Sequence, residues 1–356
     1  MKVTKVVSSS NIYNVYVGEK LRNELEQFLP KKYTSVFIVT DEIVANYYLE
    51  DVKSSLSNSN VISSVIPHGE KTKNIDTFYQ LHTDALQYGL DRESLIIALG
   101  GGVVGDVAGF VAATYMRGID FIQMPTTILA HDSSVGGKVA INHEQGKNMI
   151  GNFYSPSAVV FDVETLQTLD KKEIRSGYAE LVKEALLADA DFFNSILDSD
   201  LSTLTMLAMS DHINKGIAIK ATIVESDEKE AGIRKYLNLG HTMGHALEAL
   251  LGYGDRTHGE AVAIGLLFAM HVSEQYFKVK LPYKQLSKWL KDNNYPIELP
   301  AINTHHILNK MKLDKKTVDT NIQMILLSKI AKPEIVEVND ADLLIYLDSF
   351  INRLAN

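Results

Sequence analysis

The stretch SLIIALGGGVVGDVAGFVAATYM (residues 94–116) predicts a buried strand, a glycine-rich turn and a helix of small residues. Its Gly100, Gly102 and Gly105 match the pattern G-x-G-x-x-G between a strand and a helix, where backbone N–H groups can approach a phosphate. A tight strand-to-helix turn without a ligand explains the same glycines equally well. Asp106, just inside the helix, is unusual beside an anion, and we expect it to cap the helix or to meet a positively charged cofactor group.

Strand-like and helix-like runs alternate on either side of this stretch. The predicted strands are residues 35–40, 61–66 and 121–125, and the predicted helices are residues 41–56 and 74–88. Such alternation predicts parallel strands joined by crossover helices. Because two strand–helix units precede the glycines, the motif is not an ordinary first-unit dinucleotide fingerprint.

Helical spacing of apolar residues dominates from about residue 171 onward. The predicted helices are residues 171–189, 191–209, 211–225, 240–251, 259–277 and 283–293, and a hairpin is predicted at residues 322–330 and 334–338. The predicted fold is an α/β N-terminal domain with a Rossmann-like parallel sheet, followed by a mostly α-helical C-terminal domain. We expect these domains to cover residues 1–160 and 161–356, with a hinge near residues 150–165.

The composition excludes several classes of protein. The 356 residues carry 35 basic and 44 acidic side chains, for a formal net charge of −9, and they contain no long basic run that would suit nucleic acid. The absence of cysteine excludes disulfides, thiolate metal ligands and a cysteine nucleophile. Because we find neither a signal peptide nor an apolar stretch of about 18 residues, we expect a cytoplasmic protein without a membrane partner.

Three histidines are concentrated in GHTMGHALEALLGYGDRTHGEAVAIG (residues 240–265). His241 and His245 stand at i and i+4 and so share one face of a predicted helix, while His258 opens the next helix. Neutral imidazoles suit Zn²⁺, and a catalytic zinc usually has three protein ligands. Thr242 stands where the HExxH motif of zinc peptidases has glutamate, which argues against a peptidase. Core or capping histidines are the alternative.

A carboxylate could complete such a metal site. In SGYAELVKEALL (residues 176–187), Glu180 and Lys183 lie at i and i+3 of a predicted helix that is otherwise mostly apolar. A buried carboxylate needs a partner, and a metal ion is one. From these residues alone, an exposed Glu180–Lys183 pair on a solvated helix face is the simpler interpretation.

Scattered basic residues, several of them beside glycines, could supply a local anion site in this acidic chain. They are Arg117, Lys138, Lys147, Lys220 and Arg234, with Asn148 next to Lys147. Each one alone is better explained as a solvated surface residue, whereas together they could bind an anion.

Nearly the whole sequence resembles the 3-dehydroquinate synthase family. The segments that carry the resemblance are HGEKTK (68–73), LGGGVVGD (99–106), TYMRG (114–118), MPTTILAHDSSVGGKVAIN (124–142), GKNMIGNFYSP (146–156), SGYAELVKEALL (176–187), ESDEKEAGIRKYLNLGHTMGHALEAL (225–250) and HGEAVAIG (258–265). The resemblance implies an NAD-binding N-terminal domain, a helical metal-binding C-terminal domain and an active site between them. It also implies a homodimer.

The resemblance assigns the metal ligands, for Zn²⁺ or Co²⁺, to Glu180, His241 and His258. It makes His245 a catalytic residue rather than a ligand. The other catalytic positions that it implies are Lys138, Asn148 and Glu230.

The resemblance also implies which residues contact NAD and the substrate. The NAD positions are Asp41, Glu70, Lys73, Gly101, Gly102, Val103, Asp106, Thr126, Thr127, Lys147, Thr165, Leu166 and Thr168. The substrate positions are Arg117, Asp132, Lys138, Asn148, Lys183, Lys220, Arg234 and Asn238, with a C-terminal lysine that is either Lys315 or Lys316.

The reaction that the resemblance implies is a step of the shikimate pathway, in which 3-deoxy-D-arabino-heptulosonate 7-phosphate becomes 3-dehydroquinate and phosphate. NAD⁺ transiently oxidises C5, phosphate is eliminated, C5 is reduced again, and an intramolecular aldol step closes the ring. His245, with Glu230 and Asn148, is expected to help remove the C5 hydroxyl proton through water. Lys138, Asn148 and Arg117 are expected to hold the phosphate.

Two local departures from the family pattern occur. The run between Thr127 and Asp132 is one residue shorter than the family pattern, and Ala331 follows Ile330 where the family usually has glycine. Neither departure touches the implied metal ligands.

Three other functions compete with this interpretation. Related cyclases, such as 2-deoxy-scyllo-inosose synthase or a cyclase of seven-carbon sugar phosphates, act on substrates that lack the carboxylate which Lys220 and Arg234 are expected to bind. Metal-dependent polyol dehydrogenases share the general architecture but accumulate NADH. A non-catalytic ligand-binding protein is disfavoured by the intact metal residues and His245.

Overall fold

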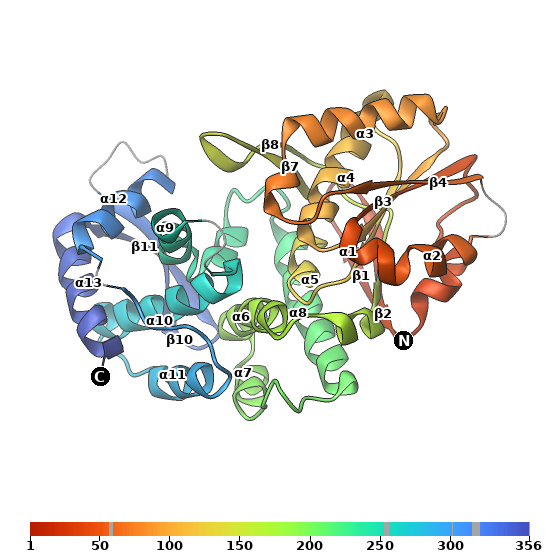
Figure 1. Cartoon of the computed structure of the whole chain (residues 1–356). Helices are drawn as coiled ribbons and strands as arrows, with labels where there is room; N and C mark the ends of the chain where they lie inside the picture. Colours follow the sequence, from red (N-terminus) through yellow and green to blue (C-terminus); the bar gives the residue numbers. More distant parts are fainter. Residues whose placement is uncertain (57–59, 253–255, 301, 315–320, 356) are drawn as a thin grey trace. The chain divides into compact units, whose positions relative to one another are not determined.

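The computed structural model describes residues 1–56, 60–252, 256–300, 302–314 and 321–355, and the chain forms two compact units (Figure 1). The first unit contains Met1–Leu169 and Met206–Lys229, and the second contains Asp170–Thr205 and Glu230–Asn356. The chain therefore passes from one unit to the other three times.

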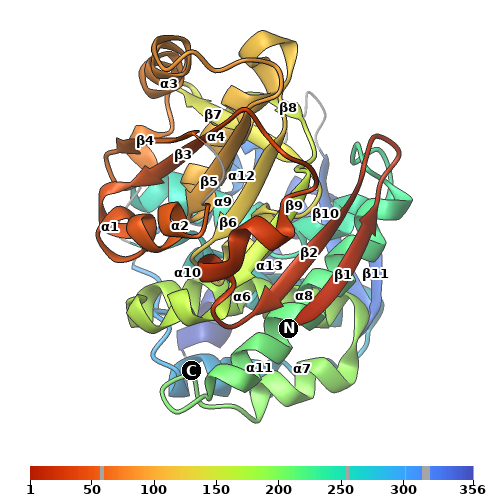
Figure 2. The ribbon, with the colours of Figure 1, turned by 90° about the vertical axis from the view of Figure 1, so that its right-hand side faces the viewer.

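This division differs from the expected one at two points. Residues 150–165 contain strands of the first unit, and the chain leaves that unit only after Leu169. Helix α8 (Met206–Ser226) belongs to the first unit, although the segments before and after it belong to the second. It packs against strand β1 (Lys2–Val7), where Asp211 forms an ion pair with Lys2 (2.5 Å) and Glu225 accepts a hydrogen bond from the Val7 N–H (3.0 Å) (Figure 2).

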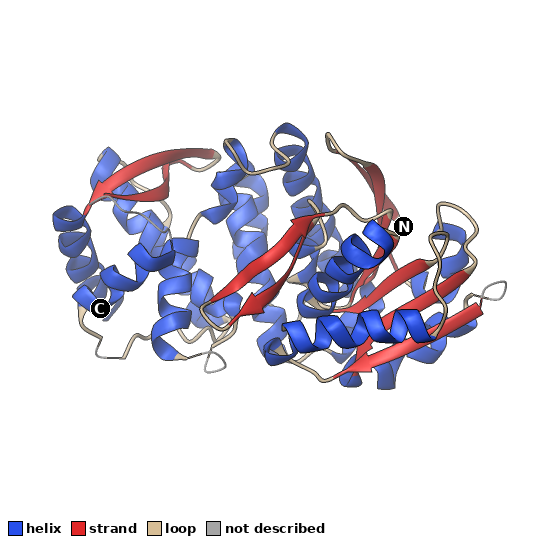
Figure 3. Ribbon diagram, turned by 90° about the horizontal axis from the view of Figure 1, so that it is seen from above, coloured by secondary structure: helices blue, strands red, loops and turns tan. Residues whose placement is uncertain are grey.

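A seven-stranded sheet forms the centre of the first unit and confirms the predicted α/β fold. Its other strands are β2 (Ile12–Gly18), β3 (Ser35–Asp41), β4 (Asn60–Ile66), β5 (Leu95–Gly100), β6 (Phe121–Pro125) and β9 (Ala158–Asp162). The strand order is β1-β2-β9-β6-β5-β3-β4, and only the β1–β2 pair is antiparallel. Figure 3 shows these strands gathered in one unit and the largely helical character of the other.

The central strands are buried on both faces, which explains their continuous apolar sequences. In β3, Phe37 and Val39 belong to one apolar layer, whereas Val36 and Ile38 belong to the opposite layer. Helices α3 (Ile75–Gln87) and α4 (Gly102–Thr114) contribute to the first layer. The second layer includes η1 (Leu21–Phe28) and a continuous helix made of α1 (Glu42–Val44), the π-helical turn η2 (Ala45–Leu49) and α2 (Glu50–Ser54).

Short elements complete the first unit. They are η3 (Glu70–Thr72), η4 (Tyr115–Arg117), α5 (Ala130–Ser133), the hairpin of β7 (Lys138–His143) and β8 (Gly146–Phe153), and η5 (Val163–Thr168).

The second unit is mainly helical, as predicted. Its elements are α6 (Lys171–Ala188), α7 (Ala190–Leu197), η6 (Ile233–Asn238), α9 (His241–Leu251), α10 (His258–Phe277), α11 (Tyr283–Asp292), α12 (Thr304–Asp314), β10 (Asn321–Lys329), β11 (Lys332–Asn339) and α13 (Asp340–Ala355). Every residue of α10 from Gly259 to Ser273 is buried, so this helix is the core of the unit. The predicted hairpin is confirmed, since β10 and β11 pair antiparallel.

The helix predicted over residues 191–209 is wrong in its second half. Helix α7 ends at Leu197, and α8 begins only at Met206. Helix α11 and its C-cap residue bind the intervening backbone, because Trp289 Nε1 donates to Ser199 O (2.8 Å) and Asn293 Oδ1 accepts from the Leu201 N–H (2.8 Å). These distant partners compete with helical hydrogen bonds. Within the described ranges, no helix combines the length and apolar character needed to cross a membrane.

Ala331 closes the β10–β11 turn in a left-handed conformation, with φ of 62°. Its N–H donates to Leu186 O of α6 (2.9 Å), so the turn cannot relax freely. A residue with a Cβ pays about 1 kcal/mol in this conformation, whereas glycine does not. We therefore expect Ala331→Gly to raise the free energy of unfolding by about 0.5–1 kcal/mol in urea titrations. Ala188→Gly, on an exposed position of α6, should lower it, and a loss in both variants would contradict this account.

His271 of α10 is buried beside α13. Its Nε2 lies 2.7 Å from Ser349 Oγ, and its Nδ1 lies 3.2 Å from Arg353 Nη1. Burial, and then the charge of Arg353, lower the pKa of His271 to about 4, although Glu274 acts in the opposite direction. The folded protein therefore keeps this imidazole neutral where an unfolded chain would protonate it.

Acid should accordingly destabilise the protein through His271. Above pH 6.5 both states are neutral and the group has no effect, but between pH 6.5 and 4 only the unfolded chain takes up the proton. The free energy of unfolding should fall by up to about 2–3 kcal/mol over this window because of this one group. His271→Gln should flatten the decrease in urea titrations at pH 7, 5.5 and 4.5, with the exposed His305→Gln as the matched control. A slope identical to that of the wild type would show that His271 is not responsible.

Candidate functional site

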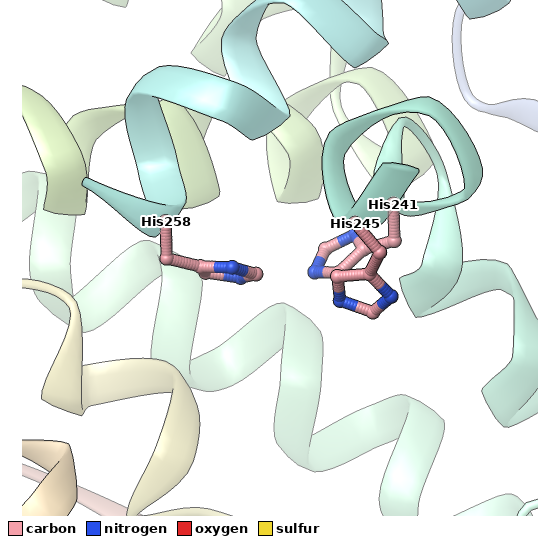
Figure 4. A group of neighbouring side chains, drawn as sticks. All are labelled: His241, His245 and His258. Atoms are coloured by element: carbon pink, nitrogen blue, oxygen red, sulfur yellow. The ribbon is translucent and has the colours of Figure 1, made fainter. Parts of the chain in front are cut away.

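The three histidines predicted as a cluster meet in the second unit (Figure 4). His241 and His245 project from the first turns of α9, and His258 projects from the first residue of α10. One ring nitrogen of each lies within 4.8 Å of the others. They are not capping residues, because Thr257 caps α10 and no side chain caps α9.

Glu180 of α6 lies against this cluster. Its Oε1 is 3.5 Å from His241 Nε2 and 3.5 Å from His258 Nε2, and its Oε2 is 2.5 Å from Lys183 Nζ. Both side chains of the Glu180–Lys183 pair are only 2% exposed, so the interpretation as a solvated helix face is wrong. The carboxylate is buried because α10 packs against α6 and because His241 and His258, the first residues of α9 and α10, lie against it.

Close helix contacts create this geometry. A Cβ on Gly259 would lie 1.9 Å from Ser176 O of α6, and a Cβ on Gly265 would lie 1.9 Å from Gly240 O before α9. Only glycine permits such approaches of α10 to both neighbours. Since Ser176 is one turn before Glu180 and Gly240 immediately precedes His241, the contacts that pack the helices also bring the candidate ligands together.

The outer nitrogens of two imidazoles are held in place. His241 Nδ1 lies 3.2 Å from Leu239 O, and His258 Nδ1 lies 3.1 Å from Glu248 Oε2. Such partners fix the ring orientation of metal-binding histidines and leave Nε2 for the ion. The residues therefore fit a divalent cation held by two imidazole nitrogens and one carboxylate oxygen, the donor set that Zn²⁺ accepts in a chain without thiolates.

The charges of the cluster are strongly perturbed. Burial lowers the pKa of His241 to about 3, although Glu180 opposes it. Burial also disfavours charge on His258, but hydrogen bonds with Glu180 and Glu248 outweigh it and raise the pKa of His258 to about 10. A cation bound at Nε2 of His258 would therefore have to displace a proton.

We expect Glu248→Gln to weaken divalent metal binding by about 10–100-fold, because the neutral amide orients His258 less strongly and makes its Nε2 a poorer donor. Competition with a chromophoric chelator would measure Zn²⁺ and Co²⁺ affinity directly. Glu337→Gln, on an exposed position of β11, is the matched control for loss of one carboxylate. Equal affinities in the two variants would mean that Glu248 does not support the site.

Other predicted residues of the second unit lie in or beside η6, which leads into α9. Arg234 is buried in η6, with 1% of its surface exposed. Asn238 Nδ2 donates to Glu230 Oε1 (2.9 Å), and Glu230 has a left-handed backbone with φ of 60°. Lys315 and Lys316 lie outside the described residues.

The predicted NAD residues of the first unit follow the carboxyl ends of parallel strands. Asp41 ends β3, Gly101 follows β5, Thr126 follows β6, and Thr165 lies in η5 after β9. Between β3 and β5 the strand order reverses, because β4 lies on one side of β3 and β5 lies on the other. Ligands of open parallel sheets bind at such a switch point.

Most of the remaining predicted NAD residues follow strands of the same sheet, whereas Lys147 lies in the separate β7–β8 hairpin. Gly102 and Val103 open α4, Leu166 and Thr168 lie in η5, and Thr127, Glu70 and Lys147 lie in β6–α5, η3 and β8 respectively. Tyr48 binds η5, since its hydroxyl lies 2.7 Å from Thr168 Oγ1 and 3.2 Å from Thr165 O.

Lys73 connects two parts of the predicted site in the first unit. Its ammonium forms an ion pair with Asp106 and donates a hydrogen bond to Asn148 Oδ1. Burial raises the pKa of Asp106, while Lys73 opposes this effect. Asp106 does not cap α4, because the cap residue is Gly101 and no side chain accepts there. The positive group that contacts Asp106 here is Lys73 of the chain itself, so the expected contact with a positively charged cofactor group stays a prediction.

The shortened run between Thr127 and Asp132 forms successive tight turns. The N–H groups of Ala130, His131 and Asp132 donate to the carbonyls three residues before them, at 3.0–3.1 Å. Asp132 then forms an ion pair with Lys220 Nζ of α8 (2.9 Å). Two predicted substrate residues are thus in contact despite the missing residue. Arg117 and Lys138 are exposed, at the end of η4 and the start of β7.

Sequence reasoning missed Glu248 and Asn142. Glu248 could have been found, since it lies one turn after His245 on the same face of α9. Asn142 Nδ2 donates to Glu70 Oε1 (2.8 Å), a contact between distant segments that no local pattern indicates.

Comparisons with known proteins give a consistent result. The pattern described as 3-dehydroquinate synthase N-terminal matches residues 63–176, and that described as 3-dehydroquinate synthase C-terminal matches residues 177–317. The chain is 54% identical to a 3-dehydroquinate synthase of Oceanobacillus iheyensis over 99% of both chains.

Two solved structures have a similar fold. A 2-deoxy-scyllo-inosose synthase complexed with carbaglucose-6-phosphate, NAD⁺ and Co²⁺ has a TM-score of 0.87 and 26% identity, over 99% of this chain and 100% of that one. A 2-epi-5-epi-valiolone synthase of Streptomyces hygroscopicus with NAD⁺ and Zn²⁺ has a TM-score of 0.85 and 22% identity, over 100% of this chain and 99% of that one.

Proposed function

The chain belongs to the 3-dehydroquinate synthase family, and from this membership we propose that it converts 3-deoxy-D-arabino-heptulosonate 7-phosphate into 3-dehydroquinate and phosphate. The observation that carries the proposal is the half-buried histidine cluster around the buried Glu180, in which Nε2 of both His241 and His258 lies 3.5 Å from Glu180 Oε1. By the same resemblance, the protein is proposed to be a phosphate-eliminating carbon–oxygen lyase of the shikimate pathway, acting in the cytoplasm as a homodimer.

We propose that NAD binds at the carboxyl-terminal edge of the first unit's sheet and that Zn²⁺ or Co²⁺ is held by Glu180, His241 and His258. When bound there, NAD⁺ would supply a reversible hydride acceptor for C5, and the divalent metal would supply a Lewis acid for the C5 hydroxyl group. Two similar structures, which contain NAD⁺ with Co²⁺ or Zn²⁺, support this pairing of cofactors.

His245 is the proposed acceptor of the C5 hydroxyl proton. Its ring lies next to the two ligand imidazoles, with centroids at 5.3 Å from His241 and 5.7 Å from His258. An imidazole suits proton transfer near neutral pH. Glu230, which accepts a hydrogen bond from Asn238, is proposed to assist through water, as is Asn148.

Lys138, Asn148 and Arg117 are proposed to hold the substrate phosphate. Arg117 and Asn148 have left-handed backbones, with φ of 69° and 56°. Asparagine tolerates this conformation better than most residues, whereas for arginine it is uncommon, and such conformations are frequent at ligand sites.

The substrate carboxylate or its hydroxyls are proposed to bind Arg234 and Lys220. Arg234 is almost fully buried, and a guanidinium away from water interacts strongly with an anion. Lys220 is 5% exposed and already carries a carboxylate partner in Asp132. Lys183, Asp132 and Asn238 complete the proposed set.

A related cyclase is the second candidate, because the 2-deoxy-scyllo-inosose synthase fold matches this chain with a TM-score of 0.87. The carboxylate distinguishes the two functions. If Arg234 and Lys220 bind a carboxylate, the protein should prefer the heptulosonate phosphate to a hexose 6-phosphate, which lacks that group.

Phosphate release from 3-deoxy-D-arabino-heptulosonate 7-phosphate tests the function. We expect release only when both NAD⁺ and divalent metal are supplied, with no net accumulation of NADH. His245→Ala should lower kcat by about 10²–10⁴-fold, the usual contribution of a proton-transfer group. His305→Ala, an exposed substitution in α12, is the matched control.

Three results would contradict the proposal. Preferred turnover of a hexose 6-phosphate would favour the related cyclase. Accumulation of NADH on polyols without phosphate release would indicate a dehydrogenase. Tight NAD⁺ binding with no turnover of any of these substrates would indicate a non-catalytic protein.

A further inference from the structure

Asn142 occupies an irregular position in the β7–β8 hairpin. The pairing of the strands shifts between Ile141 and His143, so Asn142 has no cross-strand partner in the regular register. Its side chain is half-buried and its backbone N–H donates to Lys73 O (2.8 Å). The hairpin is thereby tied to the segment that carries Glu70 and Lys73.

Both polar atoms of the Asn142 side-chain amide form hydrogen bonds. Nδ2 donates to Glu70 Oε1 (2.8 Å), and Oδ1 accepts from the Asn148 N–H (2.9 Å). Glu70 is one of the residues that the family resemblance assigns to NAD, whereas Asn148 is proposed above to bind the substrate. One side chain therefore contacts a residue proposed for each ligand.

Hydrogen bonds hold Asn148 in place. Its side chain is exposed, so apolar packing does not fix it, and its backbone is left-handed. Asn142 binds its N–H and Lys73 binds its Oδ1. Loss of the Asn142 bond would let this backbone relax, because even asparagine, which tolerates the left-handed conformation better than most residues, favours a negative φ.

We propose that Asn142 is a positioning residue that couples the NAD-binding residue Glu70 to the substrate-binding residue Asn148. This inference rests on the proposed function. The chemistry requires an amide, because the side chain must donate to a carboxylate at one end and accept from an N–H at the other. Aspartate of the same size can still accept from Asn148 but would place a second carboxylate against Glu70.

Asn142→Asp and Asn142→Ala should therefore have different effects. In Asn142→Asp, the affinity for NAD⁺ should fall about tenfold, since a charge-assisted hydrogen bond is replaced by repulsion, while kcat changes less than threefold. In Asn142→Ala both contacts are lost, and kcat should also fall about tenfold. Titration calorimetry with NAD⁺ alone and steady-state phosphate release would separate the two effects.

A double-substitution cycle, measured as NAD⁺ affinity, distinguishes coupling through Glu70 from a general loss of local structure. In a Glu70→Gln background the glutamine amide can donate to the carboxylate that Asn142→Asp introduces. The second substitution should therefore change NAD⁺ affinity less than threefold relative to Glu70→Gln alone. Asn152→Asp, on an exposed position of β8, is the matched control for an added charge in this hairpin. Thermal unfolding of each variant would confirm that the protein is folded.

The outcomes are distinct. A tenfold loss in both backgrounds would overturn the coupling through Glu70, as would wild-type NAD⁺ affinity in Asn142→Asp. Equal kcat values in Asn142→Asp and Asn142→Ala would overturn the role of the Asn148 contact. Failure of the proposed function would appear instead in the wild-type protein, as absent NAD⁺ binding or absent phosphate release.

Discussion

The contact of α10 with α6 and with the start of α9 is the constraint on which the metal-binding residues depend. Backbone atoms meet at Gly259 and Gly265 so closely that a single methyl group would collide with a carbonyl oxygen. This approach brings a carboxylate from one helix and imidazoles from two others to one point. The same helix contacts therefore pack the apolar core and position the candidate metal ligands, so a substitution that changes one also changes the other.

Buried lysines paired with carboxylates recur in both units. Lys73, Lys183 and Lys220 are each at most 5% exposed, and their partners are Asp106, Glu180 and Asp132. A buried ion pair adds little to stability, because desolvation offsets the attraction between the charges. The proposed ligands give these lysines a better explanation, since each ammonium is already removed from water and can interact strongly with an anion.

The sequence was sufficient where the signal is local. Alternating strand and helix patterns predicted the parallel sheet, and the spacing of His241, His245 and His258 predicted their cluster. Sequence patterns failed where residues distant along the chain determine the local structure. Trp289 and Asn293 bind the backbone that follows α7, where a helix was expected to continue to residue 209. The Glu180–Lys183 pair is buried where α10 packs against α6. Asp106 finds Lys73 rather than capping its own helix. None of these partners lies within the window that a periodicity pattern covers.

The place of α8 in the first unit has a consequence for synthesis on the ribosome. Strand β1 leaves the ribosome roughly 200 residues before the helix that packs against it. Until then, Lys2 lacks Asp211 and the Val7 N–H lacks Glu225. The first unit therefore cannot finish folding before α6 and α7 of the second unit have been translated. Part of the second unit must therefore leave the ribosome unfolded or partly folded while the first unit is still incomplete.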